Sequence, residues 1–269
     1  MTDTFEATLE RFHDPIKPYL PVIARFLLVV TFLEDSLRIV SQWSDQVYYL
    51  HVHRSFPFYT AELFLMINVV VMCIGSVLAI SRNHTEYAVG GLFAVVMSQA
   101  IGYGLIFDSG FFFRNLSVIG ALLMLLADSM SSKKRQIFAG LPTLSESDKS
   151  EYIQLFGRIL LVFLFLGFIF AGEFSLLRIV VSLVSGIGCI MVVIGFKAKW
   201  SAWMLVTFLS ISNVLLNNWW SLHHTHPQRD FQKYDFFQTL SIVGGFLLLT
   251  NIGPGSMSVD EKKKQSHFE

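Results

Sequence analysis

The sequence predicts an all-α polytopic membrane protein of about eight transmembrane helices, arranged as two tandem four-helix bundles in the same orientation. Of its 269 residues, 53% are hydrophobic and only 15% are charged. A soluble domain would carry roughly a quarter charged residues. The mean hydropathy is +0.55, and apolar runs long enough to cross a bilayer recur along the chain. A formal net charge of zero gives no basic field for nucleic acid, so no nucleic-acid partner is expected.

The apolar runs define the spans in order. We expect transmembrane helices at residues 21–42, 60–81, 87–107, 113–130, 155–172, 176–196, 200–220 and 236–252. Only Gly172, Glu173 and Phe174 separate the fifth span from the sixth, so a re-entrant hairpin or one long buried pair is an alternative there.

The spans and the polar stretches between them divide the chain into five segments. These are an amphipathic N-terminal segment (1–18), a first four-helix half (19–130), a cytosolic linker (131–152), a second four-helix half (153–252) and a cytosolic tail (253–269). In the N-terminal segment Phe5, Leu9, Phe12 and Ile16 recur at helical spacing. This segment packs on the protein's own cytosolic face or lies in the membrane interface.

The distribution of lysine and arginine predicts that both termini are cytosolic. With that orientation the cytosolic loops and termini collect Arg11, Lys17, Arg82, Lys133, Lys134, Arg135, Lys149, Lys197, Lys199, Lys262, Lys263 and Lys264. The opposite side receives only Arg54, Arg229 and Lys233. Short cytosolic loops of membrane proteins show this excess of positive charge.

Two stretches of the chain resemble each other closely enough to predict an internal repeat. Residues 113–123 (FRNLSVIGALL) match residues 237–247 (FQTLSIVGGFL), and residues 24–30 match residues 157–163. Gly120, Gly244 and Gly245 would allow helices to approach closely. Chance similarity between leucine-rich helices is the alternative to a true repeat.

Polar side chains gather at one depth, towards the non-cytosolic end of several spans. The stretch 31–46 (TFLEDSLRIVSQWSDQ) brings acidic and basic residues into a membrane helix, where such groups must pair or line a cavity. On a helix Glu34, Arg38, Ser41, Gln42 and Asp45 would share one face. The candidate binding residues at this depth are Glu34, Asp35, Arg38, Gln99, Tyr103, Arg114, Asn115, Asn213, Asn217 and Gln238.

Two interpretations of these residues stay open. They form a buried network in which Glu34 or Asp35 pairs with Arg114, or they line a cavity open to the non-cytosolic side. Arg25 and Arg158 lie nearer the cytosol, and we expect both to snorkel to the inner interface.

The sequence carries no pattern typical of a catalytic or cofactor site. It has no nucleophile–base pair, glycine-rich phosphate loop or cofactor fingerprint, so we expect no enzymatic activity and no cofactor. A histidine-rich loop (223–226) lacks a cysteine or carboxylate framework, so we expect no metal site. Cys73 and Cys189 lie in apolar runs and are expected to pack rather than form a disulfide.

Six long segments resemble the surfeit-locus-four family and cover nearly the whole chain. They are KPYLPVIARF (17–26), TFLEDSLRIVSQWSDQ (31–46), FFRNLSVIGALLM (112–124), GFKAKW (195–200), DFQKYDFFQTLSIVGGFLLL (230–249) and SVDEKKK (258–264). The two halves are also similar to the DoxX-like membrane superfamily, some of whose members are linked to redox chemistry.

The first resemblance implies a cargo receptor of the endoplasmic reticulum membrane that cycles to the early Golgi. Such receptors load soluble lumenal secretory cargo into COPII vesicles, and some select short, apolar, often proline-containing signals near cargo N-termini. The alternatives are a phospholipid scramblase, a small-solute transporter and a DoxX-like redox enzyme. Membrane lipids are expected partners in every case, and a homo-oligomer stays open.

The tail departs from the family pattern. Family tails commonly end with lysines three and four places from the carboxylate, where the COPI coat reads them as a retrieval signal. Here Lys262, Lys263 and Lys264 are followed by Gln-Ser-His-Phe-Glu, so COPI retrieval is an open expectation. Phe268 could contribute to a hydrophobic export signal, and an unread tail is the alternative.

Overall fold

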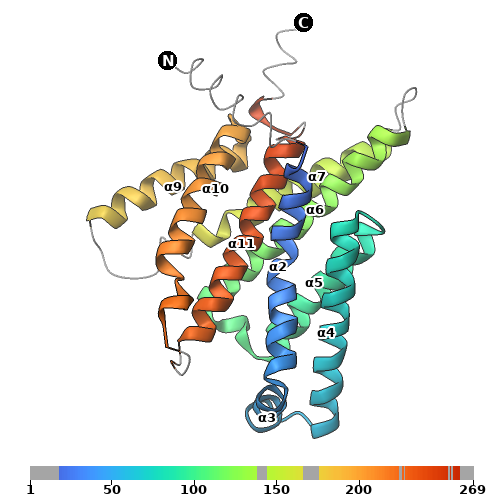
Figure 1. The fold of residues 1–269 in the computed structure, drawn as a ribbon. Coiled ribbons are helices and arrows are strands. Elements are labelled where there is room, and N and C mark those ends of the chain that lie inside the picture. Colours follow the sequence, from blue (N-terminus) through green and yellow to red (C-terminus); the bar gives the residue numbers. More distant parts are fainter. Residues whose placement is uncertain are drawn as a thin grey trace, which may run out of the picture.

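The computed structural model describes residues 18–137, 144–165, 176–223, 226, 228–253, 255 and 257–260. Within these ranges every regular element is helical (Figure 1). The predicted all-α polytopic membrane fold is confirmed. The candidate sorting residues Lys262, Lys263, Lys264 and Phe268 lie outside the described residues, as does most of the N-terminal segment 1–18.

A described helix overlaps each predicted span, but α7 begins at Leu144 instead of 155, inside the predicted linker, and α11 begins at Arg229 instead of 236. The first half contains α2 (Leu20–Ser41), α3 (Trp43–Arg54), α4 (Phe58–Ser81), α5 (Thr85–Gly102), the short 3₁₀ helix η1 (Leu105–Phe107) and α6 (Ser109–Ile137). The second half contains α7 (Leu144–Leu161), α9 (Leu176–Ile194), α10 (Ala198–Leu216), the 3₁₀ helix η2 (Trp219–Ser221) and α11 (Arg229–Ile252). Helix α3 was not predicted.

Four described helices are long and apolar enough by composition alone to cross a membrane. They cover Tyr59–Ser81, Gly110–Ser132, Ala198–Ser221 and Arg229–Ile252. Helix α2 is almost as long as these, but Arg25, Glu34, Asp35 and Arg38 give it more charge than an ordinary span carries. Such charges are tolerated at membrane depth only when they are buried against partners.

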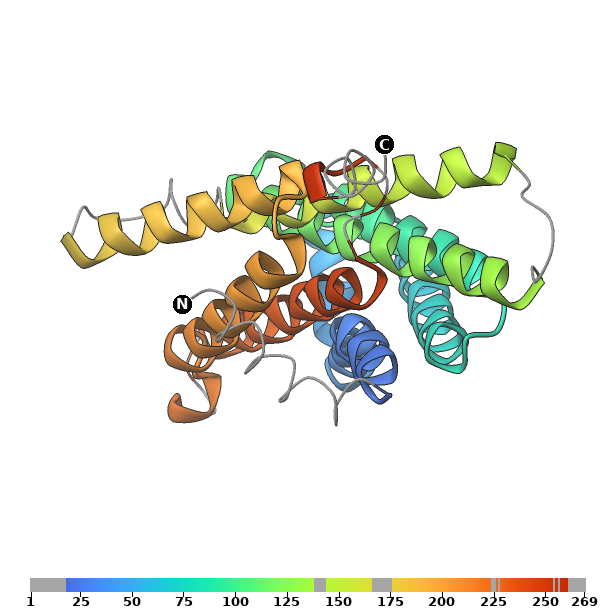
Figure 2. The same ribbon diagram turned by 90° about the horizontal axis from the view of Figure 1, so that it is seen from above.

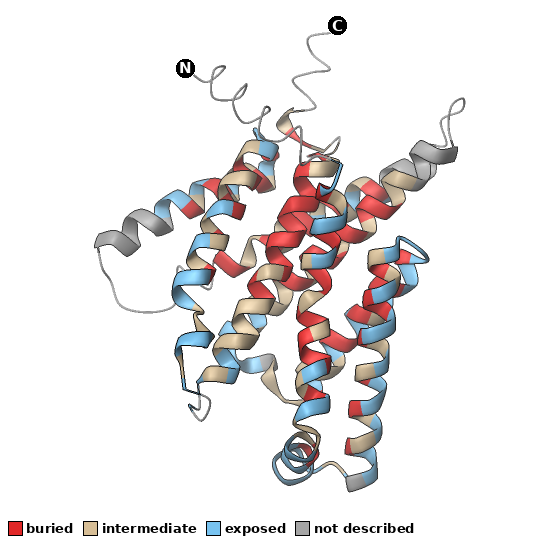
Figure 3. Ribbon diagram, in the orientation of Figure 1, coloured by how far each residue is buried: buried red, intermediate tan, exposed pale blue. Residues whose placement is uncertain are grey.

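The centre of the molecule is the pair formed by α2 and α11, which lie side by side in both views (Figures 1 and 2). Helix α11 also packs against α6 and α10, and α6 packs against α7. Burial follows this arrangement: α11 is buried continuously from Ser241 to Thr250, whereas α4 exposes apolar side chains such as Met66, Val70 and Ile74 (Figure 3). The exposed apolar faces suit contact with lipid tails, which are as apolar as these side chains.

Matched positions of the two halves make matched contacts. The Ser117 hydroxyl on α6 donates to the Leu161 carbonyl on α7 at 3.1 Å. At the corresponding positions, Ser241 on α11 donates to the Leu28 carbonyl on α2 at 2.5 Å. The first helix of each half therefore packs on the last helix of the other half, and both halves share one core. These contacts support the internal repeat.

The predicted close approaches occur at the glycines one turn further along. A Cβ added to Gly120 would lie 2.6 Å from the Leu161 nitrogen, and one added to Gly244 would lie 2.6 Å from the Leu28 nitrogen. A Cβ on Gly245 would meet Ala121 at 2.7 Å. Only glycine permits these backbones to approach so closely.

The loops sort to two ends of the molecule as their charges predict. Helix α3, η1, η2 and the start of α11 lie at one end, called here the α3 end (Figure 1). The start of α2, the α4–α5 turn with Arg82 and the α9–α10 turn with Lys197 lie at the opposite end. These basic turns are thus segregated from the α3 end, which the orientation rule predicts to be lumenal.

The prediction that Arg25 and Arg158 snorkel to the interface is wrong, because each side chain is only 1% exposed. Arg25 forms an ion pair with Asp128 on α6 and donates from Nη1 to the Ala79 carbonyl at 3.1 Å. Arg158 donates to the Met257 carbonyl at 3.3 Å. A buried partner within reach removes the reason for a long cationic side chain to extend to water.

Candidate functional site

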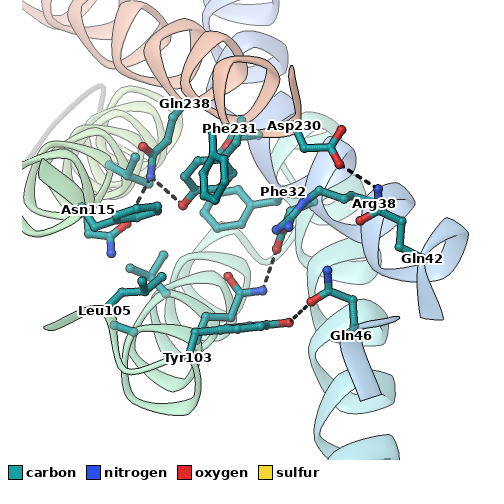
Figure 4. Close-up of a pocket in the computed structure, with 18 of the residues that line it drawn as sticks. Phe32, Arg38, Gln42, Gln46, Tyr103, Leu105, Asn115, Asp230, Phe231 and Gln238 are labelled. Atoms are coloured by element: carbon teal, nitrogen blue, oxygen red, sulfur yellow. Dashed lines mark hydrogen bonds and ion pairs between the residues drawn. The ribbon is translucent and has the colours of Figure 1, made fainter. Parts of the chain in front are cut away.

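A cavity of about 480 Å³ opens at the α3 end, between α2, α3, α5, η1, α6 and α11. Figure 4 shows side chains from these elements converging on one space. The lining residues are Thr31, Phe32, Asp35, Arg38, Gln42, Asp45, Gln46, Tyr49, Val96, Gln99, Ala100, Tyr103, Leu105, Phe111, Asn115, Val118, Asp230, Phe231, Tyr234 and Gln238. Six of the ten predicted binding residues are among them: Asp35, Arg38, Gln99, Tyr103, Asn115 and Gln238.

The cavity has an apolar floor and a polar mouth. Phe32, Val96 and Val118 lie at its deep end and are buried. Asp45 on α3 and Asp230 on α11 lie at the mouth and are exposed. Its volume falls within the range of about 300–1,000 Å³ that is typical of ligand pockets. Chemically, the space suits a ligand with an apolar portion inside and a polar portion outside.

One wall of the cavity is formed by three interacting side chains, an ion pair and a neutral amide. Asp35, which is 4% exposed, forms an ion pair with Arg38 one turn along α2. Its second oxygen accepts a hydrogen bond of 2.6 Å from Nε2 of Gln99 on α5. The carboxylate therefore joins α2 to α5, and its charge is balanced inside the wall, as a buried charge requires.

Helix α3 forms the wall nearest the mouth. The chain breaks its helical path at Gln42 and turns into α3, whose Val47 and Leu50 are buried. Gln46 accepts a hydrogen bond of 2.8 Å from the Tyr103 hydroxyl (Figure 4), and the Tyr49 ring stacks on the Tyr103 ring at 6.0 Å. These contacts tie α3 to the end of α5 and fix the entrance.

The remaining wall comes from the first turns of α11. Asp230, Tyr234 and Gln238 recur every four residues and so share one helix face. Nε2 of Gln238 donates to the Tyr234 hydroxyl at 2.9 Å and to Oδ1 of Asn115 on α6 at 3.1 Å. The sequence prediction found Gln238 but missed Asp230 and Tyr234, because it began this span at residue 236. The four-residue polar spacing was the signal that could have found them.

Glu34 does not line the cavity. It faces α11 on the other side of α2, where its Oε1 lies 3.0 Å from the Lys233 ammonium. The predicted pairing of Arg114 with Glu34 or Asp35 is wrong, because Arg114 pairs with Asp235. Neither Lys233 nor Asp235 was predicted to lie within a helix. The structure therefore separates Glu34 and Arg114 from the cavity and assigns them to contacts between helices.

Asn213 and Asn217 also lie away from the cavity. Asn213 on α10 donates to the Phe236 carbonyl on α11 at 3.0 Å. Asn217 then donates to Oδ1 of Asn213 at 2.8 Å. These two amides join α10 to the start of α11. Their predicted role in binding is unsupported by this position.

The helical face that looks into the cavity differs from the predicted one by about one residue. Thr31, Asp35, Arg38 and Gln42 line the space, whereas Glu34 and Ser41 do not. The prediction treated residues 31–46 as one continuous helix. The break at Gln42 separates the two parts, so Asp45 reaches the cavity from α3 instead.

The last described segment of the chain is anchored at the opposite end of the molecule. We name its described residues 253, 255 and 257–260 the C-terminal clasp. The Asp260 carboxylate accepts hydrogen bonds from the backbone nitrogens of Lys197 at 2.8 Å and Ala198 at 3.0 Å, which begin α10. Gln154 donates to the Gly253 carbonyl. The clasp fixes the point from which the predicted sorting tail leaves the protein.

The side chains in the described ranges form no cluster of three or more histidine, cysteine, aspartate or glutamate residues suited to a metal ion. Cys73 and Cys189 are free thiols, but only Cys189 is half-buried, and Cys73 is exposed, so the expected packing is not seen at Cys73.

Comparison with known proteins places the chain in a family. A curated relative in Schizosaccharomyces pombe, named surfeit locus protein 4 homolog, is 49% identical over 262 residues, which are 97% of this chain and 87% of the relative. The Saccharomyces cerevisiae protein named ER-derived vesicles protein ERV29 is 46% identical over 251 residues, 93% of this chain and 78% of that protein. A Drosophila melanogaster surfeit locus protein 4 homolog is 39% identical over 249 residues, 93% of this chain and 92% of that protein.

No solved structure gives a significant match. The family model described as SURF4 family matches residues 1–266. This chain belongs to the SURF4 family.

Proposed function

We propose that this protein is a non-enzymatic cargo receptor of the endoplasmic reticulum membrane. It binds soluble lumenal secretory proteins through short, largely apolar segments and packages them into COPII vesicles for transport to the Golgi. The name of the yeast relative, ER-derived vesicles protein, supports the compartment and the vesicle. In this proposal both termini are cytosolic and the α3 end is lumenal.

The observation that carries the proposal is the cavity itself. It opens at the end proposed to be lumenal, and buried Phe32, Val96 and Val118 give it an apolar interior. An apolar cargo segment would bury its side chains there. Removing apolar surface from water contributes roughly 25 cal/mol of favourable free energy per Å². Polar groups at the mouth would fix the direction of entry.

The clasp supports the part of the proposal that concerns packaging by coat proteins. Coat proteins assemble on the cytosolic side. Asp260, the last described residue before the proposed sorting tail, is hydrogen-bonded to the start of α10. The COPII coat is the proposed reader of the tail, and the COPI coat is a second reader if Lys262–Lys264 act in retrieval. Substituting the three lysines tests retrieval, and substituting Phe268 separately tests export.

Filling the cavity tests the receptor function. Ala100 lines the cavity on α5 and is half-buried, so Ala100→Trp should occupy the space and abolish binding of an apolar cargo peptide. Ala94 lies on the exposed side of the same helix, so Ala94→Trp is the matched control and should bind normally. Equal binding by both folded variants would refute a cargo site in the cavity.

The scramblase and transporter alternatives make a different prediction. They require lipid or solute movement in liposomes that contain only the purified protein. The lining residues of α2 extend no deeper than Thr31, and buried apolar residues such as Leu28 and Ala24 follow towards the opposite end. The cavity lining thus ends part-way along α2, which suits a binding site better than a path across the bilayer.

A further inference from the structure

The charges that line the cavity do not balance. Three carboxylates, of Asp35, Asp45 and Asp230, face one guanidinium, that of Arg38. Arg38 pairs with Asp35 in the wall, so these two charges cancel each other. The carboxylates of Asp45 and Asp230 are left at the mouth.

Neither mouth carboxylate has a cationic partner among the described residues. Asp45 makes no ion pair there, and Asp230 accepts one hydrogen bond of 3.0 Å, from the neutral amide of Gln42 (Figure 4). Each lies in the first turn of its helix, where the helix dipole supplies about half a positive charge. The dipoles therefore offset part of the two negative charges and leave the mouth negative.

Three basic residues at the start of α11 and near the start of α6 are engaged elsewhere. Lys233 pairs with Glu34 on the far side of α2. Arg229 lies over the Trp219 ring of η2, with 5.2 Å from its Cζ to the ring centroid. Arg114 pairs with Asp235. The mouth is thus left without compensation from these three cations.

Two aromatic rings accompany the two carboxylates. Tyr49 comes one turn after Asp45 on α3, and Phe231 follows Asp230 on α11. Both rings line the cavity, and Phe231 is 63% exposed. A carboxylate and an aromatic face together attract a cation, through charge and through the ring quadrupole. A neutral apolar ligand would gain nothing from the carboxylates.

We propose that the cavity selects a segment that carries a cationic group directly beside its apolar residues, and that Asp45 and Asp230 bind this cation at the mouth. The inference rests on the proposed cargo-receptor function and names the ligand's chemistry. The cation is an ammonium or a guanidinium. Its source is the free amino terminus of the cargo or a lysine or arginine side chain near it.

Peptide binding to the purified full-length protein in detergent tests the proposal and separates the two sources. The probes are one apolar peptide with a free amino terminus, its N-acetylated form, and an N-acetylated form with a lysine added next to the apolar residues. We expect acetylation to weaken binding about fivefold, the upper end for a partly exposed ion pair. If a side chain can serve as the source, the added lysine should restore binding.

Variants assign the effect to the mouth. In Asp45→Asn/Asp230→Asn, the free and acetylated peptides should bind within about twofold of each other, because the neutral amides no longer favour a cation. Glu62→Gln on α4 is the matched control, since Glu62 lies towards the α3 end of its helix but does not line the cavity. This variant should retain the fivefold difference. The difference should also shrink as salt rises in the wild-type protein.

The outcomes separate this inference from the proposed function. If no peptide form binds the wild-type protein, the receptor function itself is refuted. If all forms bind equally to the wild-type protein, at low and at high salt, the receptor function stands and the cation preference is refuted.

Discussion

Glu34 and Lys233 face each other across the contact between α2 and α11, with carboxylate oxygen and ammonium nitrogen 3.0 Å apart. Asp35, the next residue, points in a different direction and forms the cavity wall with Arg38 and Gln99. Two neighbouring acidic residues therefore have separate tasks, because consecutive side chains on a helix diverge by about 100°.

This separation predicts different phenotypes for two isosteric changes. Glu34→Gln should lower the free energy of unfolding by about 1–2 kcal/mol, the effect of weakening a hydrogen-bonded charge pair, and should leave cargo-peptide affinity unchanged. Asp35→Asn should weaken peptide binding, because Arg38 and Gln99 lose the group that positions them. Thermal unfolding and peptide titration measure the two effects. The assignment fails if folded Glu34→Gln loses binding while Asp35→Asn retains it.

The matched glycine contacts predict matched costs in the two halves. Gly120→Ala and Gly244→Ala should each destabilise the protein by about 1–3 kcal/mol, because the added Cβ meets backbone atoms of the facing helix. Gly90→Ala and Gly186→Ala are the controls, since nothing lies within 4 Å of a Cβ at either position. Unfolding midpoints of the four purified variants measure the difference. Equal midpoints in all four would contradict the close packing of the two helix pairs.

The buried ion pair of Arg25 and Asp128 predicts a strong effect of removing one partner. Asp128→Leu leaves the guanidinium, which is 1% exposed, without its carboxylate and should cost about 3–5 kcal/mol. Combining it with Arg25→Met should recover most of that loss, because an apolar pair of similar volume needs no counter-charge. A double variant as unstable as Asp128→Leu would show that the charge itself is not the cause.

The C-terminal clasp predicts a change in the tail without a change in the cavity. Asp260→Ala removes the acceptor for two backbone nitrogens at the start of α10 and should cost about 1 kcal/mol, as loss of a helix cap does. In this variant a protease should also cleave a C-terminal epitope tag from the tail more readily. Asp108→Ala removes a comparable contact, to the Phe111 nitrogen, at the other end, and should leave tail cleavage unchanged. Equal cleavage in the two variants would argue against the clasp.

The helices could be predicted from the sequence because an apolar run of about 20 residues has few alternatives in a bilayer. The depth of the site could also be predicted, since Asp35, Gln99 and Gln238 interrupt such runs at one level. Their partners could not be predicted in the same way. Side-chain partners depend on the rotation of each helix, and the break at Gln42 shifts that rotation for everything that follows it.

The second source of error was the start of α11. Residues 229–235 are too polar to predict a membrane helix, so the sequence predicts a loop for Lys233, Tyr234 and Asp235, whereas the structure has them in α11. Each has a partner on another helix or lines the cavity. The tertiary contacts of these polar groups stabilise this stretch as a helix, and periodicity alone does not report such contacts.

Site-specific crosslinking tests the central claim, that cargo binds in the cavity, most directly. A photoreactive residue replaces Val118, on the cavity floor, in one variant and Ala94, on the outer side of α5, in another. Crosslinking of each variant to a secretory cargo peptide is then measured. We predict a saturable crosslink from position 118 that unlabelled peptide competes away, and none from position 94. Crosslinking from position 94 with none from position 118 would contradict the account.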